Sequence, residues 1–365
     1  MTNSQSDQDP TQATDIAHVI SVDAMGGDKG PSVVVKGLST FLSKKPDARV
    51  ILHGPVAELT VLVDEHGLGE RVTISNADGV VEMKDKPSNV LRHGKNTSMW
   101  SAVDAVRNKK ASVCVSCGNT GALMAISMIR LRKASGVKRP AIACLWPSHN
   151  PQGFNVMLDA GADIRADEED LLTYALMGTS YARNGLDIAR PRVGLLNVGT
   201  EEHKGRAELR AAHDLIAKAA DRGDYEYIGF VEGGDLPSAR VDVIVTDGFT
   251  GNIALKTGEG TANLISGLLR AALTATPISM LGALLSRSAL TKLRSRIDPR
   301  HVNGGVFLGL NQTVIKSHGS ADETGIEAAL HLAYRLGQQG FSDKLASRVA
   351  SAASLAQDTI NQSAD

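Results

Sequence analysis

The residues with the clearest chemical meaning in this chain lie in two turns that are near copies of each other. The segments VCVSCGNTGALMA (113–125) and VIVTDGFTGNIAL (243–255) each place a β-branched apolar run before a G-x-T-G turn that leads into a helix-like segment. Glycine lets a ligand approach the backbone closely, and the first N–H groups of a helix attract negative charge. We therefore expect the two turns, with the hydroxyls of Thr120 and Thr250, to share a site for phosphate or an oxyanion at the carboxyl ends of parallel strands.

Other polar loops also follow predicted strands, and we expect them to form one pocket rim with the two turns. They include DAMGGD, LDAGAD, NVGTEEHKG, EGGD and KSHGSAD. None of them matches the motifs of serine hydrolases, zinc proteases, P-loop NTPases or dinucleotide-binding folds, so we expect no metal and no cofactor. The expected rim residues are Asp23, Gly26, Gly27, Asp28, Asp159 and His318. The expected phosphate or oxyanion ligands are Gly118, Asn119, Thr120, Gly121, Asp247, Gly248, Thr250 and Gly251.

Composition favours an α/β enzyme over a β-sandwich or a disordered chain, with 42% apolar residues, 4% aromatic residues and 36 glycines among 365 residues. The formal net charge of −1 lacks the basic excess of a duplex-binding protein, so we expect no nucleic-acid partner. The first residues do not resemble a secretion signal, and the three cysteines lie in apolar context. These features predict a reducing cytosolic environment.

Strand-like and helix-like segments alternate along the chain, which predicts a mostly parallel sheet covered by helices on both faces. The expected strands are 19–24, 48–54, 71–77, 112–117, 192–199, 225–233 and 241–248. The expected helices include 98–107, 122–134 and 168–182. We expect a disordered polar tail at 1–17, a single α/β domain over 18–345, and a C-terminal helix and tail over 346–365.

The segment 261–300 is rich in leucine and basic residues and reads as a helical hairpin inserted into the sheet. Its longest uncharged run, 271–286, has 16 residues. That is shorter than the roughly 20 residues that a transmembrane helix needs. Two readings stay open, namely an ordinary core or dimer helix pair, and a cationic apolar tip that lies on an anionic membrane. The residues of the expected tip are Leu281, Leu284, Leu285 and Arg287.

Cys114 and Cys117 form a C-x-x-C pattern, which raises the possibility of a redox pair. Residues three positions apart on a strand point to opposite faces, however. We therefore expect buried structural thiols. Two cysteines without a nearby second pair also make a poor zinc site.

The chain resembles the bacterial phosphate acyltransferases of phospholipid synthesis through six motifs in the same order. The motifs are ISVDAMGGDKGP, SCGNTGALMA, LDAGAD, NVGTEEHKG, VDVIVTDGFTGNIALKTGEG and LGLNQTVIKSHGSAD. The resemblance extends from about Val19 to Asp322 and departs from the family at Cys117, where alanine is expected. It implies a three-layer α/β/α sandwich similar to isocitrate dehydrogenases and phosphotransacetylases.

The resemblance also implies an activity and partners. The expected reaction moves a long acyl group from acyl carrier protein to inorganic phosphate, giving acyl phosphate for a downstream glycerol-3-phosphate acyltransferase in phosphatidic acid synthesis. The expected protein is a cytoplasmic homodimer that associates peripherally with the membrane. Because phosphate is largely ionised near neutral pH, it can attack a thioester without a protein nucleophile.

The resemblance gives Lys204 the positive charge at phosphate and Asn252 an N–H for the thioester oxygen. Asp247 would orient Lys204 or a neighbouring hydroxyl. The residue types alone leave other readings open. Lys204 beside Glu201 and Glu202 also fits a solvated surface charge. Asn252 also fits a helix cap, and Asp247 fits a residue that holds its own turn.

Three other functions fit parts of the pattern. A phosphotransacetylase-like enzyme would use a coenzyme A thioester, and its preference for acyl-chain length would distinguish it. A dehydrogenase of similar fold would be stabilised by a nicotinamide cofactor. A membrane-bound scaffold that recruits lipid enzymes through the hairpin would show no turnover.

Overall fold

The computed structural model describes residues 18–297, 304–338, 340–342 and 344–345, and its contacts divide the chain into two compact units. Unit 1 comprises Met1–Leu131, Gln312–Ile315 and Gly319–Gly340. Unit 2 comprises Arg132–Asn311, Lys316–His318 and Phe341–Asp365. The predicted tail (1–17) and the predicted C-terminal segment (346–365) lie outside the described residues. Where the sequence predicts one domain over 18–345, the chain leaves unit 1 after residue 131 and returns to it near its end.

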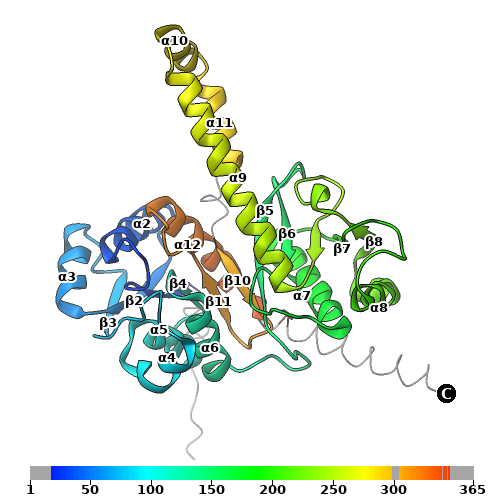
Figure 1. Ribbon diagram of the computed structural model, residues 1–365. Coiled ribbons are helices and arrows are strands. Elements are labelled where there is room, and N and C mark those ends of the chain that lie inside the picture. Colours follow the sequence, from blue (N-terminus) through cyan, green and yellow to red (C-terminus); the bar gives the residue numbers. More distant parts are fainter. Residues whose placement is uncertain (1–17, 298–303, 339, 343, 346–365) are drawn as a thin grey trace, which may run out of the picture. The chain divides into compact units, whose positions relative to one another are not determined.

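Unit 1 is built on parallel strands in the order β3-β2-β1-β4, with β11 beside β4 (Figure 1). The strands are β1 (Val19–Asp23), β2 (Arg49–Gly54), β3 (Val72–Asn76), β4 (Val113–Ser116) and β11 (Thr313–Lys316). The helices are α2 (Pro31–Lys44), α3 (Val56–Glu65), α4 (Pro87–His93), α5 (Ser98–Arg107), α6 (Thr120–Arg130) and α12 (Glu323–Gln338), with the short η1 (Gly94–Asn96).

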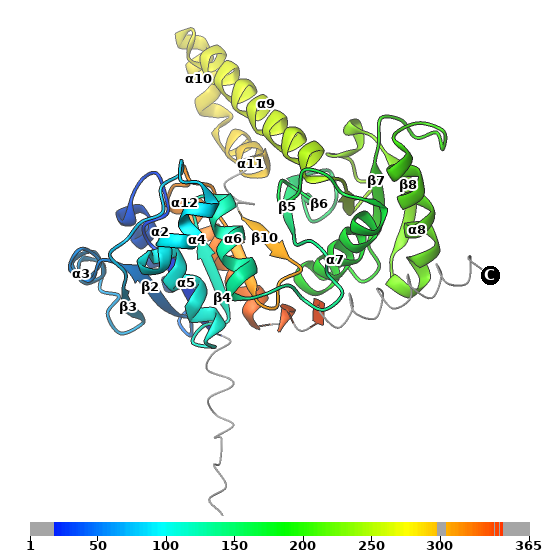
Figure 2. The same cartoon turned by 60° about the horizontal axis from the view of Figure 1, so that its bottom comes forward.

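Helices cover both faces of the unit 1 strands. Helices α2, α3 and α12 lie on one face, and α4, α5 and α6 lie on the other (Figure 2). Helices α2 and α12 pack closely, because a Cβ added at Gly37 would lie 2.7 Å from the Cβ of Ile326. The absence of a side chain at this glycine lets the two helices approach. This arrangement confirms the predicted parallel α/β layering.

Unit 2 combines a parallel set of strands with an antiparallel hairpin, in the order β10-β5-β6-β9-β7-β8. Strands β6, β9, β7 and β8 pair in parallel, whereas β5 is antiparallel to both β6 and β10. The strands are β5 (Ala141–Pro147), β6 (Phe154–Leu158), β7 (Arg192–Leu196), β8 (Glu226–Val231), β9 (Val243–Val245) and β10 (Gly305–Leu308). The helices are α7 (Glu168–Leu186), α8 (Ala207–Gly223), α9 (Gly248–Thr274), α10 (Pro277–Leu285) and α11 (Arg287–Ile297), with the short η2 (Gly233–Asp235).

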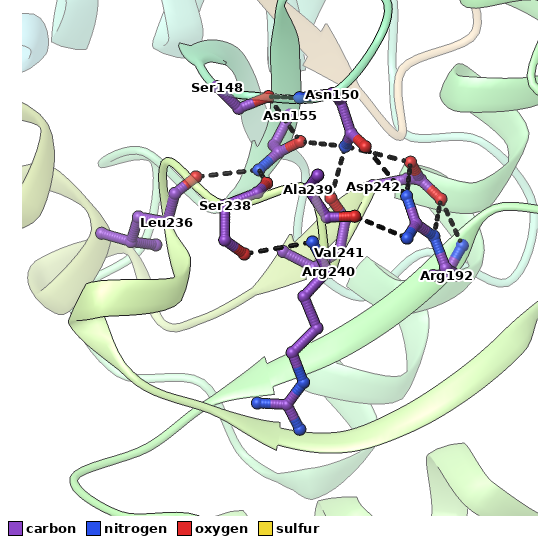
Figure 3. A network of polar contacts seen from close by, with 10 residues as sticks. All are labelled: Ser148, Asn150, Asn155, Arg192, Leu236, Ser238, Ala239, Arg240, Val241 and Asp242. Atoms are coloured by element: carbon purple, nitrogen blue, oxygen red, sulfur yellow. Dashed lines mark hydrogen bonds and ion pairs between the residues drawn. The ribbon is translucent and has the colours of Figure 1, made fainter.

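The amino ends of the parallel strands in unit 2 are held together by a buried polar network (Figure 3). Arg192, at the start of β7, donates from Nε and from a terminal nitrogen to the two carboxylate oxygens of Asp242, at 2.9 Å each. Asn150 donates to Asp242 and to the carbonyl of Val241, which ties the loop after β5 to the strand before α9. Such bidentate, charge-assisted pairs are geometrically specific. The network leaves the opposite, carboxyl ends of these strands for the polar loops.

The predicted hairpin segment 261–300 falls on the second half of α9, on α10 and on α11, with 298–300 outside the described residues. Trp146 of β5 supports the first half of α9, because a Cβ at Gly258 would lie 2.6 Å from the indole ring. Beyond that point the helix is exposed, and Leu264 and Leu268 are 61% and 62% exposed. No described helix alone is long and apolar enough to cross a membrane. Helices α9 and α10 together meet that criterion by length and composition, with a bend of 115° between them.

The predicted strands and helices are present, with differences of a few residues at their ends. The sequence reading missed four strands, namely β5, β6, β10 and β11. Strands β5 and β6 form an antiparallel hairpin across residues 148–153, where Ser148 donates its N–H to the carbonyl of Gly153 at 2.9 Å. The strong β/α alternation elsewhere concealed this hairpin.

Candidate functional site

The second G-x-T-G turn is organised around the buried carboxylate of Asp247, which is the N-cap of α9. Its Oδ1 accepts the N–H of Thr250 at 2.8 Å, and its Oδ2 accepts the hydroxyl of Thr250 at 3.0 Å. Arg206, which precedes α8, forms an ion pair with the same carboxylate. Asp247 therefore orients a neighbouring hydroxyl, as one of the sequence hypotheses stated. Its cationic partner is Arg206 rather than Lys204, and the Thr250 hydroxyl already donates to a carboxylate.

The loop that follows β6 packs against this turn and explains two of its glycines. The carboxylate of Asp159 is fully buried and accepts backbone N–H groups. The donors are Ile142, Gly161, Ala162 and Asp163, at 2.8 to 3.2 Å. Burial raises the pKa of Asp159 to about 6, and these N–H groups act in the opposite direction. A Cβ added at Gly248 would lie 2.1 Å from the carbonyl oxygen of Asp163, and one at Gly251 would lie 1.9 Å from that of Asp159.

Asn252 lies in the second turn of α9 and faces the same loop. Its Nδ2 donates to the carbonyl of Ala160 at 3.2 Å. Because Asp247 is the N-cap, Asn252 does not cap the helix. Asn252 is exposed, and the hydrogen bond to Ala160 uses only one of the two N–H bonds of its side-chain amide. The amide can therefore offer a second donor to a ligand.

Lys204 lies in the loop between β7 and α8, where its ammonium is 2.7 Å from a carboxylate oxygen of Glu201. This hydrogen bond raises the pKa of Lys204, so the side chain is charged at neutral pH. The side chain is 44% exposed, as the surface-charge reading predicted. The backbone here is held by Asn197, whose Nδ2 donates to the carbonyl of Lys204 at 3.1 Å. A role at phosphate requires the ammonium to exchange Glu201 for the phosphate.

The first G-x-T-G turn starts its helix differently. Asn119, inside the turn, is the N-cap of α6, and its Oδ1 accepts the N–H of Ala122 at 3.0 Å. In the second turn the N-cap precedes the first glycine. The two similar sequences therefore enter their helices in registers that differ by two residues. The first turn has a neutral amide cap, and the second has a carboxylate cap.

Beneath the first turn, the hydroxyl of Ser116 donates to Oδ2 of Asp23 at 2.7 Å and accepts the N–H of Gly118 at 3.0 Å. Burial raises the pKa of Asp23. Gly26 lies directly against the turn, since a Cβ there would be 2.7 Å from the nitrogen of Gly118. The neighbouring Asp28 donates its N–H to the carbonyl of Gly319 at 2.8 Å. These contacts bring the first predicted rim residues together around the turn, within unit 1.

Each turn leaves two backbone N–H groups open at the start of its helix. Thr120 and Gly121 begin α6, and Gly248 and Phe249 begin α9. Among the described residues, no acceptor is hydrogen-bonded to these four N–H groups. Open N–H groups at the positive end of a helix favour an anion. The predicted binding of an oxyanion or a phosphate oxygen at each turn stays a prediction, for which these N–H groups would be the donors.

The remaining candidates are less suited to catalysis. His318 lies 3.3 Å from Glu259, and burial lowers its pKa. All three cysteines are buried and none of them is in a disulfide among the described residues, as predicted for structural thiols, and burial raises the pKa of Cys114 and of Cys144. A thiol that is protonated at neutral pH is a poor nucleophile. Within the described residues, no group of three or more His, Cys, Asp or Glu side chains could hold a metal ion.

The predicted site residues are divided between the two units. Unit 1 holds Asp23, Gly26, Gly27, Asp28 and 118–121, and unit 2 holds Asp159, Lys204, 247–252 and His318. The sequence reading missed Ser116 and Arg206. A signal was present for Arg206, because it lies two positions after Lys204 in the same polar loop. Only the fold shows that its guanidinium reaches the cap of α9.

Comparison with known proteins defines the family. The model of a family described as "Fatty acid synthesis protein" matches residues 18–344. The chain belongs to the fatty acid synthesis protein family. Relatives named phosphate acyltransferase include one from Paracoccus denitrificans, which is 66% identical over 333 residues, covering 91% of this chain and 90% of that protein. Another, from Ruegeria pomeroyi, is 64% identical over 341 residues, covering 93% of this chain and 92% of the relative.

Solved structures show the same fold at low sequence identity, as the family resemblance implied. A phosphotransacetylase from Streptococcus pyogenes has a TM-score of 0.57 and 17% identity, covering 87% of this chain and 93% of that structure. The EutD phosphotransacetylase from Staphylococcus aureus has a TM-score of 0.56 and 15% identity, covering 88% and 94%. These structures confirm the predicted α/β fold of the phosphotransacetylase type.

The packing of α9 against the loop after β6 can be tested with two glycine substitutions in the same helix. Gly251→Ala should lower the free energy of unfolding by about 1–3 kcal/mol or more, because its Cβ overlaps the carbonyl of Asp159. Gly260→Ala is the matched control, since nothing lies within 4 Å of a Cβ there. It should raise stability by up to about 1 kcal/mol through helix propensity. Urea denaturation measures both, and equal midpoints for the two variants would contradict the packing of this loop.

Proposed function

We propose that this protein transfers a long fatty acyl group from an acyl carrier protein thioester to inorganic phosphate. The product is acyl phosphate, which a glycerol-3-phosphate acyltransferase then consumes. Membership of the fatty acid synthesis family and the relatives named phosphate acyltransferase support acyl transfer to phosphate. The observation that carries the proposal is the second turn, where two open N–H groups and the Arg206 guanidinium converge on one helix start.

The chemistry needs positioning and charge stabilisation rather than a protein nucleophile. A phosphate oxygen attacks the thioester carbonyl carbon, and the carbonyl electrons move to oxygen. The resulting oxyanion collapses, the carbon–sulfur bond breaks, and the carrier thiolate leaves and takes up a proton. Donors that face the developing oxyanion lower the barrier. Holding phosphate and thioester side by side contributes further.

Each candidate side chain has a defined part in this proposal. Arg206 neutralises Asp247 and offers its remaining N–H groups to phosphate, which suits the guanidinium fork. Lys204 exchanges its contact with Glu201 for phosphate. Asn252 gives the open N–H of its amide to the thioester oxygen. The first turn, with Thr120, offers a second pair of open N–H groups for an anionic or carbonyl oxygen within unit 1.

The proposed reaction is tested by incubating purified protein with palmitoyl-acyl carrier protein, with and without phosphate. We expect acyl phosphate and free carrier thiol only when phosphate is present. Activity should survive a chelator and prior alkylation of the enzyme's own thiols, because the proposed steps use neither a metal nor a cysteine of the enzyme. Palmitoyl-coenzyme A is the comparison donor. A strong preference for a short-chain coenzyme A thioester would favour the phosphotransacetylase-like alternative, and loss of turnover with chelator would exclude the mechanism.

The same assay separates the three side chains. Lys204→Met, Asn252→Ala and Arg206→Met should each lower kcat by about 100-fold or more, as removal of one oxyanion donor does elsewhere. Arg206→Lys keeps the charge but loses the fork, so it should raise the KM for phosphate more than it lowers kcat. Arg240→Met removes a cation that pairs with Asp235 elsewhere in unit 2 and is the matched control. A near wild-type rate for any site variant would return that residue to a structural role.

We further propose that α10 rests on the membrane and that a second copy of the chain covers the apolar length of α9. The support is exposure, because Leu281, Leu284 and Leu285 are 58%, 63% and 79% exposed. Arg287 follows them at an exposed position. An exposed apolar surface beside a cation suits an anionic bilayer. Exposed apolar side chains along α9, such as those of Ile265 and Leu268, suit helix packing in a homodimer.

The tip proposal predicts the behaviour of a double variant. Leu281→Asp with Leu285→Asp should abolish co-sedimentation with anionic vesicles but leave dimerisation and turnover of a soluble acyl carrier substrate unchanged. Val61→Asp is the control, because Val61 is 56% exposed on α3, away from the tip sequence. Raised salt should weaken wild-type binding through screening. Continued sedimentation of the double variant would exclude the tip as the anchor, and inactive monomers would identify it as dimer core.

A further inference from the structure

Unit 1 contains a pocket of about 360 Å³ beside the first G-x-T-G turn. One wall is the loop after β1, and the other is the segment that precedes α4. The lining residues are Met25, Gly26, Gly27, Asp28, Val80, Val81, Glu82, Met83 and Lys84. We infer that this pocket holds the fatty acyl chain of the thioester donor and of the acyl phosphate product. The inference rests on the proposed function, and it assigns to this pocket the selection of acyl-chain length.

The wall formed by residues 80–84 suits an apolar chain, and the opposite wall carries the carboxylate of Asp28. Val80 and Met83 are 42% and 43% exposed, so both side chains present apolar surface to the pocket that they line. Two charges on the same segment cancel locally, because Lys84 Nζ lies 3.0 Å from a carboxylate oxygen of Glu82. The apolar surface therefore continues along the wall without an isolated charge from this pair.

Both walls are attached to the turn that offers open N–H groups. Asn119 donates from Nδ2 to the carbonyl of Met83 at 2.8 Å while its Oδ1 caps α6. On the other side, Gly26 lies against Gly118 of the turn. An apolar pocket and an anion-binding helix start thus share two fixed connections. A ligand with a long apolar tail and a carbonyl or phosphate head matches both parts, and an acyl thioester or acyl phosphate is such a ligand.

The wall residue Met83 is also suited to chains of different length. Its Cε would lie 2.2 Å from a Cβ at Gly319, so the side chain lies over a glycine of the KSHGSAD loop. Methionine is unbranched and adapts to irregular apolar partners. Burial of each further methylene of the acyl chain contributes about fourfold to affinity. A larger side chain that fills the pocket should therefore lower the affinity for long acyl chains more than the affinity for short ones.

The experiment compares octanoyl-, lauroyl- and palmitoyl-carrier protein as donors. In Val80→Phe and Met83→Phe we expect kcat/KM for palmitoyl relative to octanoyl to fall by about tenfold or more. Val80→Ala and Met83→Ala enlarge the pocket and should leave or raise the ratio. Val61→Phe is the matched control, since it adds the same ring to an exposed valine of unit 1 that does not line the pocket. Binding of a fluorescent long-chain fatty acid gives a readout that does not need turnover.

The outcomes separate this inference from the proposed reaction. A wild-type protein that forms no acyl phosphate from any donor refutes the proposed function. A wild-type protein that turns over, with a chain-length ratio in both phenylalanine variants within about twofold of the control, refutes the pocket. A fall in the ratio together with weaker fatty acid binding, in the pocket variants but not in the control, supports it.

Discussion

The start of α9 depends on one buried carboxylate, that of Asp247. A carboxylate at this end of a helix is favourable for the dipole, but it repels the phosphate that the turn is proposed to bind. Arg206 resolves the conflict because it pairs with the carboxylate and brings a positive charge to the same place. The same carboxylate takes the N–H and hydroxyl of Thr250, so the first two N–H groups of the helix are the ones left open. Asp247 therefore determines where α9 begins, holds the guanidinium of Arg206 beside it, and leaves the N–H groups of Gly248 and Phe249 without an acceptor among the described residues.

The first turn reaches a similar result with a different charge arrangement. Its cap is the neutral amide of Asn119. The oxygen of this amide accepts an N–H of the helix, and its nitrogen donates to the segment before α4. The carboxylate of Asp23 lies beneath the turn, where it accepts the hydroxyl of Ser116. Without a carboxylate at the cap, no cation is required beside it. A neutral cap with an apolar wall suits the less charged part of a reactant, and a charged cap with an arginine suits phosphate.

The sequence predicted the layers of the fold and both helix starts, and the features that it did not predict have physical causes. The alternation of apolar strands and amphipathic helices predicted the layers, since local periodicity determines which face of each element is buried. The repeat of G-x-T-G predicted both helix starts. It did not predict their different registers. Asn119 caps α6 while its amide is bonded to Met83, and Asp247 caps α9 while its carboxylate is paired with Arg206, and both partners are distant in the sequence. The pairing of Arg206 with Asp247 and the packing of Gly251 on Asp159 are likewise long-range contacts, 41 and 92 residues apart. Spacing carries no information about such contacts.

Helix α9 is a single rod of 27 residues, which at 1.5 Å per residue is about 40 Å long. Its first turn carries the open N–H groups, and its last turns carry exposed leucines and lead into the bend before α10. Only its first half is supported by the strands of unit 2. The helix is thus fixed at the end with the open N–H groups and exposed at the apolar end. The two ends of one rigid helix can therefore be coupled. If binding of a surface at the apolar end changes the affinity of the first turn for an anion, then binding of the anion must change the affinity for that surface by the same factor.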